Sequence, residues 1–463
     1  MTIRPTPESG GDAHSWARHL DQVLQRVDEA IDRAGWTTEQ IRSHQERGLR
    51  HLLAYSIEHS PFHAERLAGI DPESFTLDDL ASLPTMTKRQ VMGEFDRVVT
   101  DRHLTREAVD RHVASAPKEL EYILDEYLPI ASGGSSGERG VFVYDKAAFA
   151  EFVLNLMRPA MANMRDVGIT SDTPVESAII GGGATVHGSG AIGALLGQVG
   201  SPVRMTRIPA TLPTEELVRR LNEMQPPAIT AYPTVLARLA AEKTAGRLTI
   251  EPLSLNVTSE PLTDEARVAI EAAFGLEVGN TYGCSEGLSG MSRPGENAFV
   301  FADESCIVEL VDTHNRPVGP GEVSAKVLLT NLYNLTQPLI RYELTDRFRV
   351  VPGPHPDGHL RATIEGRTDE PFRFGTVLVH PLVVRSVLVR RAEVYEYQVH
   401  QRASGIEVHV IADSTLDCAG LAAELTLALA TAGLQGAEAT VEPVELIPRD
   451  LATGKARRFV PLS

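Results

Sequence analysis

Short apolar runs alternate with amphipathic stretches between residues 147 and 283, and this alternation constrains the fold more than any other feature of the chain. Four runs have the length and composition of buried strands, at 175–180, 202–208, 227–232 and 253–258. Apolar residues three and four positions apart predict helices at 147–164, 214–224, 234–246 and 263–274. Strands that alternate with helices in this way predict an α/β fold with a largely parallel sheet.

The flanking regions differ from this central part. Residues 1–14 are polar, and we expect them to be disordered. A helical segment follows, whereas the stretch at about 305–350 reads as antiparallel strands joined by turns. The sequence therefore predicts a large multi-layer N-terminal domain over 15–366, with a helical start, an α/β core and a β-rich subdomain at 305–350. A small, mobile α+β C-terminal domain is predicted over 367–463.

The overall charge narrows the range of partners. Lys and Arg total 44 and Asp and Glu total 62, which gives a formal net charge of −18. An acidic chain without a basic patch argues against nucleic acid and anionic membrane as partners. The N-terminus has no signal-peptide h-region. The sequence contains no run of about 18 apolar residues, so we expect no membrane span. The three cysteines have neither disulfide nor zinc spacing, so we expect a cytoplasmic protein.

The stretch ASGGSSGERG at 131–140 has the composition of a phosphate-binding loop. Its glycines let the backbone turn tightly and bring N–H groups close to an anion, and its serine hydroxyls add donors. A plain flexible turn is the alternative interpretation. The loop is not a Walker A sequence, since no Gly-Lys-Ser/Thr follows, and Glu138 stands where such loops usually carry lysine.

Four further stretches contain residues that could carry chemistry. TYGCSEG places Glu286 in a glycine-flanked turn, and RYELTDRF places Asp346 at the end of an apolar segment. EGRTDEPF carries Arg367 and Asp369 between the predicted domains, and PRDLATGKARRFV places Lys455 near the C-terminus. Each also has a structural interpretation: a helix or turn cap for the first two acids, a surface ion pair for the Arg and Asp, and a solvated basic run for the lysine.

In this order and spacing, the five stretches resemble the adenylate-forming superfamily of acyl-CoA synthetases, luciferases and adenylation domains. Three stretches resemble the phenylacetate–CoA ligase branch in particular: LLAYSIEHSPFHAERL, LASLPTMTKRQVM and SEPLT at 259–263. The resemblance covers about residues 40–460. It implies an enzyme that joins a carboxylic acid to ATP, releases pyrophosphate and forms an acyl-adenylate, with CoA as the acyl acceptor. It also implies Mg²⁺ as a cofactor.

The resemblance implies a role for each matching residue. The nucleotide would be bound by Ser132, Gly133, Gly134, Ser135, Ser136, Gly137, Ser259, Glu260, Pro261, Tyr282, Gly283, Ser285 and Asp346. The first six would hold phosphate, Tyr282 would pack beside adenine and Asp346 would accept from the ribose hydroxyls. Glu286 would hold Mg²⁺, which prefers carboxylate oxygen. Arg367 would act at the ribose or phosphate region, Lys455 would reach the α-phosphate and the carboxylate, and Asp369 would be the hinge of the small domain.

The acid would lie in a pocket lined by Gly181, Gly182, Gly183, His187, Tyr232 and Cys284. Three consecutive glycines leave room for a ring, and Tyr232 offers an aromatic wall. Mainly from the resemblance, the predicted substrate is a small aromatic or cyclic carboxylic acid. His187 could pair with a polar substituent or have a structural role. Cys284 has no partner His at a readable spacing, so we interpret it as pocket wall and not as a nucleophile.

The chain departs from the family pattern at Glu138, at Thr345 and after Asp369, where Glu370 and Phe374 replace the usual residues. In relatives this last region helps to build the CoA channel, so the acceptor stays open: CoA, an amine, a carrier protein or another small nucleophile. A nucleotidyltransferase that moves AMP to a cofactor hydroxyl, and a non-catalytic nucleotide-binding protein, are the alternative functions. Homodimers are common in the branch, but no residue pattern here indicates one.

Overall fold

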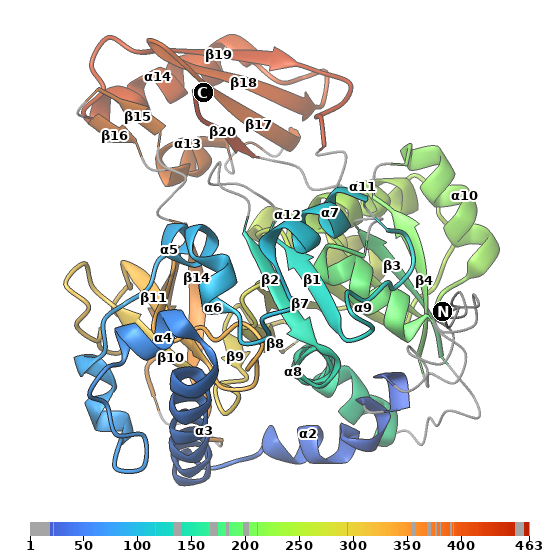
Figure 1. Cartoon of the computed structure of the whole chain (residues 1–463). Helices are drawn as coiled ribbons and strands as arrows, with labels where there is room; N and C mark the ends of the chain where they lie inside the picture. Colours follow the sequence, from blue (N-terminus) through green and yellow to red (C-terminus); the bar gives the residue numbers. More distant parts are fainter. Residues whose placement is uncertain are drawn as a thin grey trace, which may run out of the picture.

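The computed structural model describes residues 19–462 with the exception of 22, 116, 133–139, 167–174, 182–184, 198–202, 211, 294, 354, 356, 368–371, 376, 380, 389–390, 392 and 450–457. The predicted disorder of residues 1–14 therefore lies outside the described residues. The described chain forms a large α/β body and a C-terminal α+β unit (Figure 1). Their helices and strands agree with the predicted fold class.

Helices open the described chain and pack at several places around the large body (Figure 1). They are α2 (Val27–Arg33), α3 (Thr38–His59), α4 (Pro61–Arg66), the 3-10 helix η1 (Leu77–Ser82), α5 (Lys88–Gly93), α6 (Phe95–Val98) and α7 (Arg106–Ser115). A capping box starts α3, because Thr37 and Gln40 each satisfy the other's backbone N–H. Pro61 cannot extend that helix and instead begins α4.

The centre of the large body is a nine-stranded sheet with the order β13-β14-β9-β8-β7-β6-β5-β3-β4. Its strands are β3 (Val175–Gly181), β4 (Val203–Pro209), β5 (Ala228–Ala231), β6 (Ser254–Thr258), β7 (Val278–Gly283), β8 (Ser289–Ser292), β9 (Phe299–Phe301), β13 (Asp346–Val350) and β14 (Arg361–Arg367). Neighbours pair in parallel from β4 to β7 and antiparallel from β7 to β13. The predicted parallel pairing therefore holds for one half of the sheet.

Helices pack on both faces of the parallel half. They are α8 (Lys146–Asp166), α9 (Gly188–Leu196), α10 (Thr214–Met224), α11 (Pro233–Thr244) and α12 (Asp264–Phe274). Ile180, Ile229 and Val257 point to one face and pack with residues of α10, α11 and α12. Ile179 and Met205 point to the other face, in the core that contains α8 and α9. The predicted helices and strands of this region are therefore confirmed.

Two smaller sheets complete the large body. β1 (Tyr127–Ala131) and β2 (Val141–Asp145) form an antiparallel pair, and β10 (Cys306–Val311), β11 (Lys326–Asn331) and β12 (Tyr342–Leu344) form a three-stranded antiparallel sheet. The strands predicted at 305–350 are present, but the last of them, β13, belongs to the nine-stranded sheet. The reason is that its partner, β14, lies further along the chain, and a local pattern does not reveal such a pairing.

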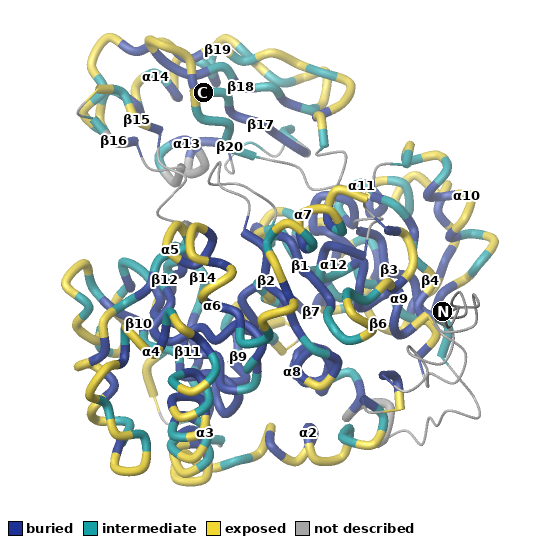
Figure 2. Tube along the Cα trace, viewed as in Figure 1, coloured by how far each residue is buried: buried dark blue, intermediate teal, exposed yellow. Residues whose placement is uncertain are grey.

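The C-terminal unit has its own sheet and its own core. Its elements are β15 (Phe372–Phe374), β16 (Val377–Val379), α13 (Pro381–Leu388), β17 (Val394–Arg402), β18 (Gly405–Ala412), α14 (Cys418–Thr431), β19 (Glu438–Pro443) and β20 (Phe459–Val460). Val399 and Val408 of the sheet pack with Leu421 and Leu425 of α14. Figure 2 shows the buried residues along these strands and, separately, along the central sheet of the large body. Among the described helices, none combines the length and the apolar character that crossing a membrane requires.

Candidate active site

The two ends of the predicted phosphate loop lie side by side, while residues 133–139 between them lie outside the described residues. The Ser132 N–H donates to the Gly140 carbonyl at 2.8 Å, and Ser132 Oγ accepts from the Gly140 N–H at 2.9 Å. Lys88 Nζ, on α5, lies 3.2 Å from Ser132 Oγ. Lys88 therefore places a cation at the root of a loop that carries Glu138 in place of lysine. Sequence analysis missed it, because the two contacting residues are 44 positions apart.

The end of β1 also lies beside the predicted acid pocket. The Ala131 N–H donates to the Val186 carbonyl at 2.7 Å, and His187 Nδ1 lies 3.4 Å from the Ala131 carbonyl oxygen. His187 directly precedes α9, and its side chain is buried. The root of the phosphate loop and the acid pocket therefore meet at one edge of the nine-stranded sheet.

Glu286 lies in a turn whose backbone is held by three side chains from distant parts of the chain. Its own carbonyl accepts from Asn331 Nδ2 at 3.0 Å, the preceding carbonyl accepts from Tyr144 Oη at 2.6 Å, and the following one accepts from Tyr333 Oη at 2.7 Å. Gly287 has a φ of 105°, and a Cβ there would lie 2.2 Å from Asn331 Nδ2. Only glycine fits this position, so the turn presents Glu286 from a rigid backbone.

Glu286 is 8% exposed, and its Oε1 lies 3.5 Å from Tyr342 Oη. Burial raises the pKa of the Cys284 thiol well above its usual range, and the negative charges of Glu286 and Asp346 raise it further. These three groups are therefore within electrostatic reach of one another. A thiol with a raised pKa stays protonated and is a poor nucleophile, which agrees with the interpretation of Cys284 as pocket wall.

Asp346 and Arg367 stand opposite each other on neighbouring strands. β13 and β14 are antiparallel, and the register pairs Asp346 with Arg367. Asp346 is buried. Sheet pairing therefore brings together two residues that the motifs had assigned separately to the ribose and phosphate contacts.

The 259–261 turn begins where β6 ends. Ser259 has a φ of 69°, a left-handed conformation that costs a non-glycine residue about 1 kcal/mol and is found preferentially at functional sites. The Glu260 carboxylate accepts from Thr234 Oγ1 at 2.6 Å. The ring of Tyr282, on β7, packs edge-on against Phe348, with the centroids 5.2 Å apart. Contact of Tyr282 with adenine stays a prediction.

Arg449 connects the C-terminal unit to this turn. Its Nη1 and Nη2 each lie 3.0 Å from Thr234 Oγ1, and Nη2 lies 3.0 Å from Glu396 Oε1, on β17. Nη1 lies 3.6 Å from Glu260 Oε1, and the side chains of Arg449, Glu260 and Glu396 are each no more than 7% exposed. Burial raises the pKa of Glu396, while the charges of Arg449 and Arg238 oppose that rise. A buried group of charges therefore joins the two parts of the molecule.

A cavity of about 1550 Å³ lies against one face of the nine-stranded sheet. Six of the predicted site residues line it: His187, Tyr232, Ser259, Gly283, Cys284 and Ser285. Gly181 is adjacent, because a Cβ there would lie 3.5 Å from Tyr232 Oη. Several predicted residues lie outside the described part of the chain, namely Gly133, Gly134, Ser135, Ser136, Gly137, Gly182, Gly183, Asp369 and Lys455; of Arg367 only the backbone is described.

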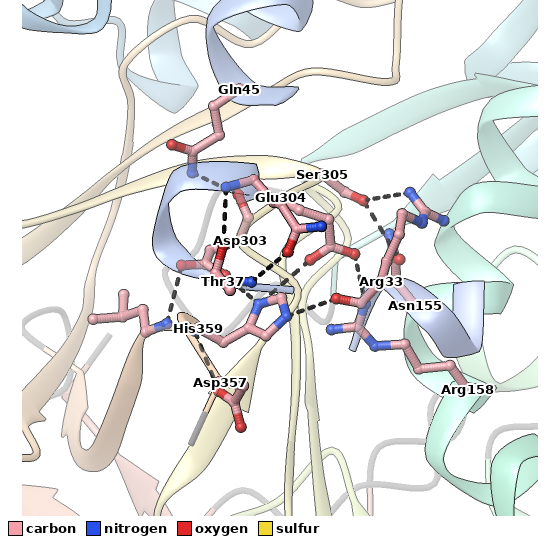
Figure 3. A network of polar contacts seen from close by, with 12 residues as sticks. Arg33, Thr37, Gln45, Asn155, Arg158, Asp303, Glu304, Ser305, Asp357 and His359 are labelled. Atoms are coloured by element: carbon pink, nitrogen blue, oxygen red, sulfur yellow. Dashed lines mark hydrogen bonds and ion pairs between the residues drawn. The ribbon is translucent and has the colours of Figure 1, made fainter. Parts of the chain in front are cut away.

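A second group of buried acids, shown in Figure 3, was not singled out in the sequence. His359 Nδ1 lies 2.6 Å from Asp303 Oδ1, its Nε2 lies 2.9 Å from the Arg33 carbonyl oxygen, and Arg158 pairs with Glu304. Asp303, Glu304 and His359 offer ligand atoms within 4.8 Å of one another, as a metal site would. Each acid already has a positively charged or imidazole partner, so we interpret the group as a structural tie between α2, α8 and the central strands.

This architecture is the fold of the adenylate-forming CoA ligases. A solved structure of 2-hydroxyisobutyryl-CoA ligase, in the postadenylation state with 2-HIB-AMP, matches with a TM-score of 0.67 and 18% identity over 93% of this chain and 91% of that one. A benzoate CoA ligase from Burkholderia xenovorans matches with a TM-score of 0.51 and 18% identity over 72% of this chain and 67% of that one.

In sequence, the chain is similar to phenylacetate-coenzyme A ligases. The Pseudomonas putida protein is 25% identical over 396 residues, covering 80% of this chain and 81% of the relative. The Thermus thermophilus protein is 28% identical over 386 residues, covering 79% of each. No family model matches the chain. The resemblance that the five motifs predicted is therefore confirmed by relatives that cover about four fifths of the chain.

Proposed function

We propose that this chain activates a carboxylic acid with ATP as an acyl-adenylate, releases pyrophosphate and passes the acyl group to CoA. One observation carries the proposal: the charges of Glu286 and Asp346 act on Cys284, and Cys284 lines the same cavity as Ala131 at the root of the Gly/Ser loop. The similarity of the chain to phenylacetate-coenzyme A ligases also supports the proposal.

The first half-reaction brings a carboxylate to the α-phosphate of ATP, so two anions must approach each other. Positive charge and N–H donors placed at the reacting atoms lower the cost of this approach. Lys88 would supply such a charge at the root of the loop, where its Nζ already lies 3.2 Å from Ser132 Oγ. Asp346 would accept from the ribose hydroxyls, which suits an ionised carboxylate.

Glu286 fits a Mg²⁺ ion, because its carboxylate is a hard oxygen ligand and its backbone is fixed by Tyr144, Asn331 and Tyr333. When bound there, the ion would neutralise part of the triphosphate charge. The residues of this chain would orient the nucleotide around it, and burial of the site would exclude water.

We propose that residues 367–463 form the small domain, which turns about a hinge at Asp369 and presents Lys455 to the α-phosphate. The support is the position of Arg449 beside Thr234 and Glu260. In the sequence, these two residues closely follow Tyr232 and Ser259, which line the cavity. The few residues between Arg449 and Lys455 span at most about 20 Å when extended, so the lysine would reach the same edge of the sheet.

A direct test is product identification with a panel of acids, ATP and Mg²⁺, with and without CoA. We expect AMP, pyrophosphate and an acyl-CoA thioester. AMP retained on the product would instead indicate a nucleotidyltransferase, and an acyl group found on an amine or a carrier protein would replace CoA as the acceptor. No acid-dependent release of pyrophosphate with any acid would contradict the proposal.

Lys455→Ala should slow adenylation at least about a hundredfold, because a lysine that contacts the transferred group mainly stabilises the transition state. The melting temperature should stay unchanged. Lys118→Ala, which removes an exposed lysine of the large body, is the matched control. A wild-type rate for Lys455→Ala would exclude this residue from the mechanism.

Size-exclusion chromatography with light scattering tests whether the enzyme forms the homodimer that is common in the branch.

A further inference from the structure

The cavity extends along the whole parallel half of the sheet. It is lined by His187 and Gly283 at the carboxyl ends of the strands, and by Val175 and Ser254 at the amino ends. Along β6 alone the lining runs from Ser254 to Thr258, a rise of about 13 Å. Leu253, which is 81% exposed, also lines it, so the cavity reaches the surface at the amino edge of the sheet.

The size of the cavity exceeds what a single-ring acid needs. A pocket of roughly 300–1,000 Å³ is usual for a drug-sized ligand, whereas this cavity measures about 1550 Å³. The nucleotide end, near Ser259 and Ser285, would hold the adenylate. A single-ring acid attached there would leave the long part of the cavity, toward the amino ends of the strands, unfilled.

The two walls of the cavity mix apolar and polar side chains. The sheet wall carries the small and polar Ser177, Thr230, Ser254, Asn256 and Thr281, and on the same face the apolar Ile179, Val203 and Met205. The opposite wall, from α8 and α9, carries Phe152, Leu156 and Ile192 together with Asn155. A ligand that fits both walls has a mostly apolar body with a few hydrogen-bonding groups.

Two polar atoms at the cavity have no hydrogen-bond partner among the described residues. Ser177 Oγ and Asn155 Nδ2 belong to side chains that line the cavity, and these residues are 5% and 4% exposed. Buried polar groups in native proteins are nearly always satisfied, so each such atom calls for a partner that the described part of the chain does not supply. Oxygen atoms on a bound ligand would satisfy both.

We propose that the acid is extended and mostly apolar, with a few oxygen substituents, and that its body fills this cavity while its carboxylate lies at the Tyr232 and His187 end. The proposal rests on the proposed function and names the substrate class of the same site. It replaces the small aromatic or cyclic acid expected mainly from the resemblance with a longer, multi-ring or long-chain body.

The test compares kcat/KM for adenylation of phenylacetate, decanoate and cholate, which are a single-ring, a long-chain and a hydroxylated multi-ring acid. We expect at least one of the two extended acids to exceed phenylacetate by roughly tenfold or more, because each added apolar contact in a fitting pocket favours the larger substrate. A preference for phenylacetate over both extended acids would overturn the proposal. If none of the acids were adenylated, this result would contradict the proposed function instead.

Thr230→Leu narrows the long part of the cavity and tests the location of the acid. We expect kcat/KM for the extended acid to fall roughly tenfold, with phenylacetate affected about twofold or less. Thr440→Leu makes the same change on an exposed strand position of β19 and should alter neither. If Thr230→Leu does not fold, Ser177→Val takes its place. An equal loss for all acids, or no loss for any, would show that the body of the acid lies elsewhere.

Discussion

The two faces of the parallel half of the sheet are built from alternate residues of the same strands, yet they differ in what they contact. Ile180, Ile229 and Val257 on one face pack closely with helices α10 to α12. Ser177 and Thr230 on the other face line a cavity of about 1550 Å³. Branched aliphatic side chains fill space and exclude water, whereas small polar ones leave room beside them. The first face is therefore packed against helices, whereas the second combines residues packed with α8 and α9, such as Ile179 and Met205, with room for a ligand.

Ile229 and Thr230 are adjacent on β5 and give the largest expected contrast between the faces. Ile229 is 1% exposed, so Ile229→Ala should lower the free energy of unfolding by about 2–5 kcal/mol through the cavity it creates. Thr230→Ala should cost less than about 1 kcal/mol, because its side chain already borders an empty space. Urea unfolding measures both values. Equal losses would mean that the second face is packed like the first.

Arg449→Ala tests whether the C-terminal unit completes the edge of the sheet where the cavity begins. Because it removes hydrogen bonds to the Glu396 carboxylate and Thr234, we expect adenylation to slow roughly 10–100-fold. Acid-dependent ATP–pyrophosphate exchange measures that step alone. Arg402→Ala, which removes a half-exposed ion pair of the same unit, should have little effect. Unchanged exchange in Arg449→Ala would separate this contact from catalysis.

Stability should depend on pH through buried groups of the packed regions. Burial lowers the pKa of His63 to about 3, and the nearby Arg66 adds to this effect. The unfolded chain therefore binds the proton more readily than the folded chain does. The contribution of neutral His63 to the free energy of unfolding is complete above about pH 6.5. It decreases by about 1.4 kcal/mol for each pH unit below that value.

His63→Gln should make the unfolding free energy less sensitive to pH between about 6.5 and 5, and calorimetry across that range tests it. His103→Gln is the matched control, because the His103 side chain is 86% exposed. If both variants keep the wild-type pH dependence, the acid sensitivity has another origin.

Lys88→Gln is expected to have the smallest effect. It should raise the KM for ATP about tenfold and leave the fold intact, because the lysine would supply charge to the phosphates at the root of the loop without contacting the reacting carboxylate. Arg89→Gln, at the exposed neighbouring position, is the control. An unchanged KM for ATP would mean that the loop binds phosphate through its backbone alone.

Local patterns in the sequence predicted the packed face well and the edges of the site poorly. The helix predicted at 214–224 has those bounds in the structure, because its apolar periodicity is set by residues within a few turns. The pairing of β13 with β14, within the nine-stranded sheet, was not predicted, since β14 lies further along the chain. Such pairings leave no periodic signal.

The site residues follow the same rule. The motifs marked Glu286 and Asp346, but not the side chains that hold the Glu286 turn, Tyr144, Asn331 and Tyr333, which come from two other parts of the chain. Lys88 was missed for the same reason. The size of the cavity could not be predicted from the sequence either, because it depends on how far α8 and α9 lie from the sheet and not on any one residue.

Acid-dependent exchange of labelled pyrophosphate into ATP tests the central claim most directly, because it reports reversible formation of the acyl-adenylate before any acceptor takes part. We predict exchange that requires both the acid and Mg²⁺, proceeds without CoA, and is greatest with an extended acid. Exchange that proceeds equally without any acid, or no exchange with any acid of the panel, would contradict the account.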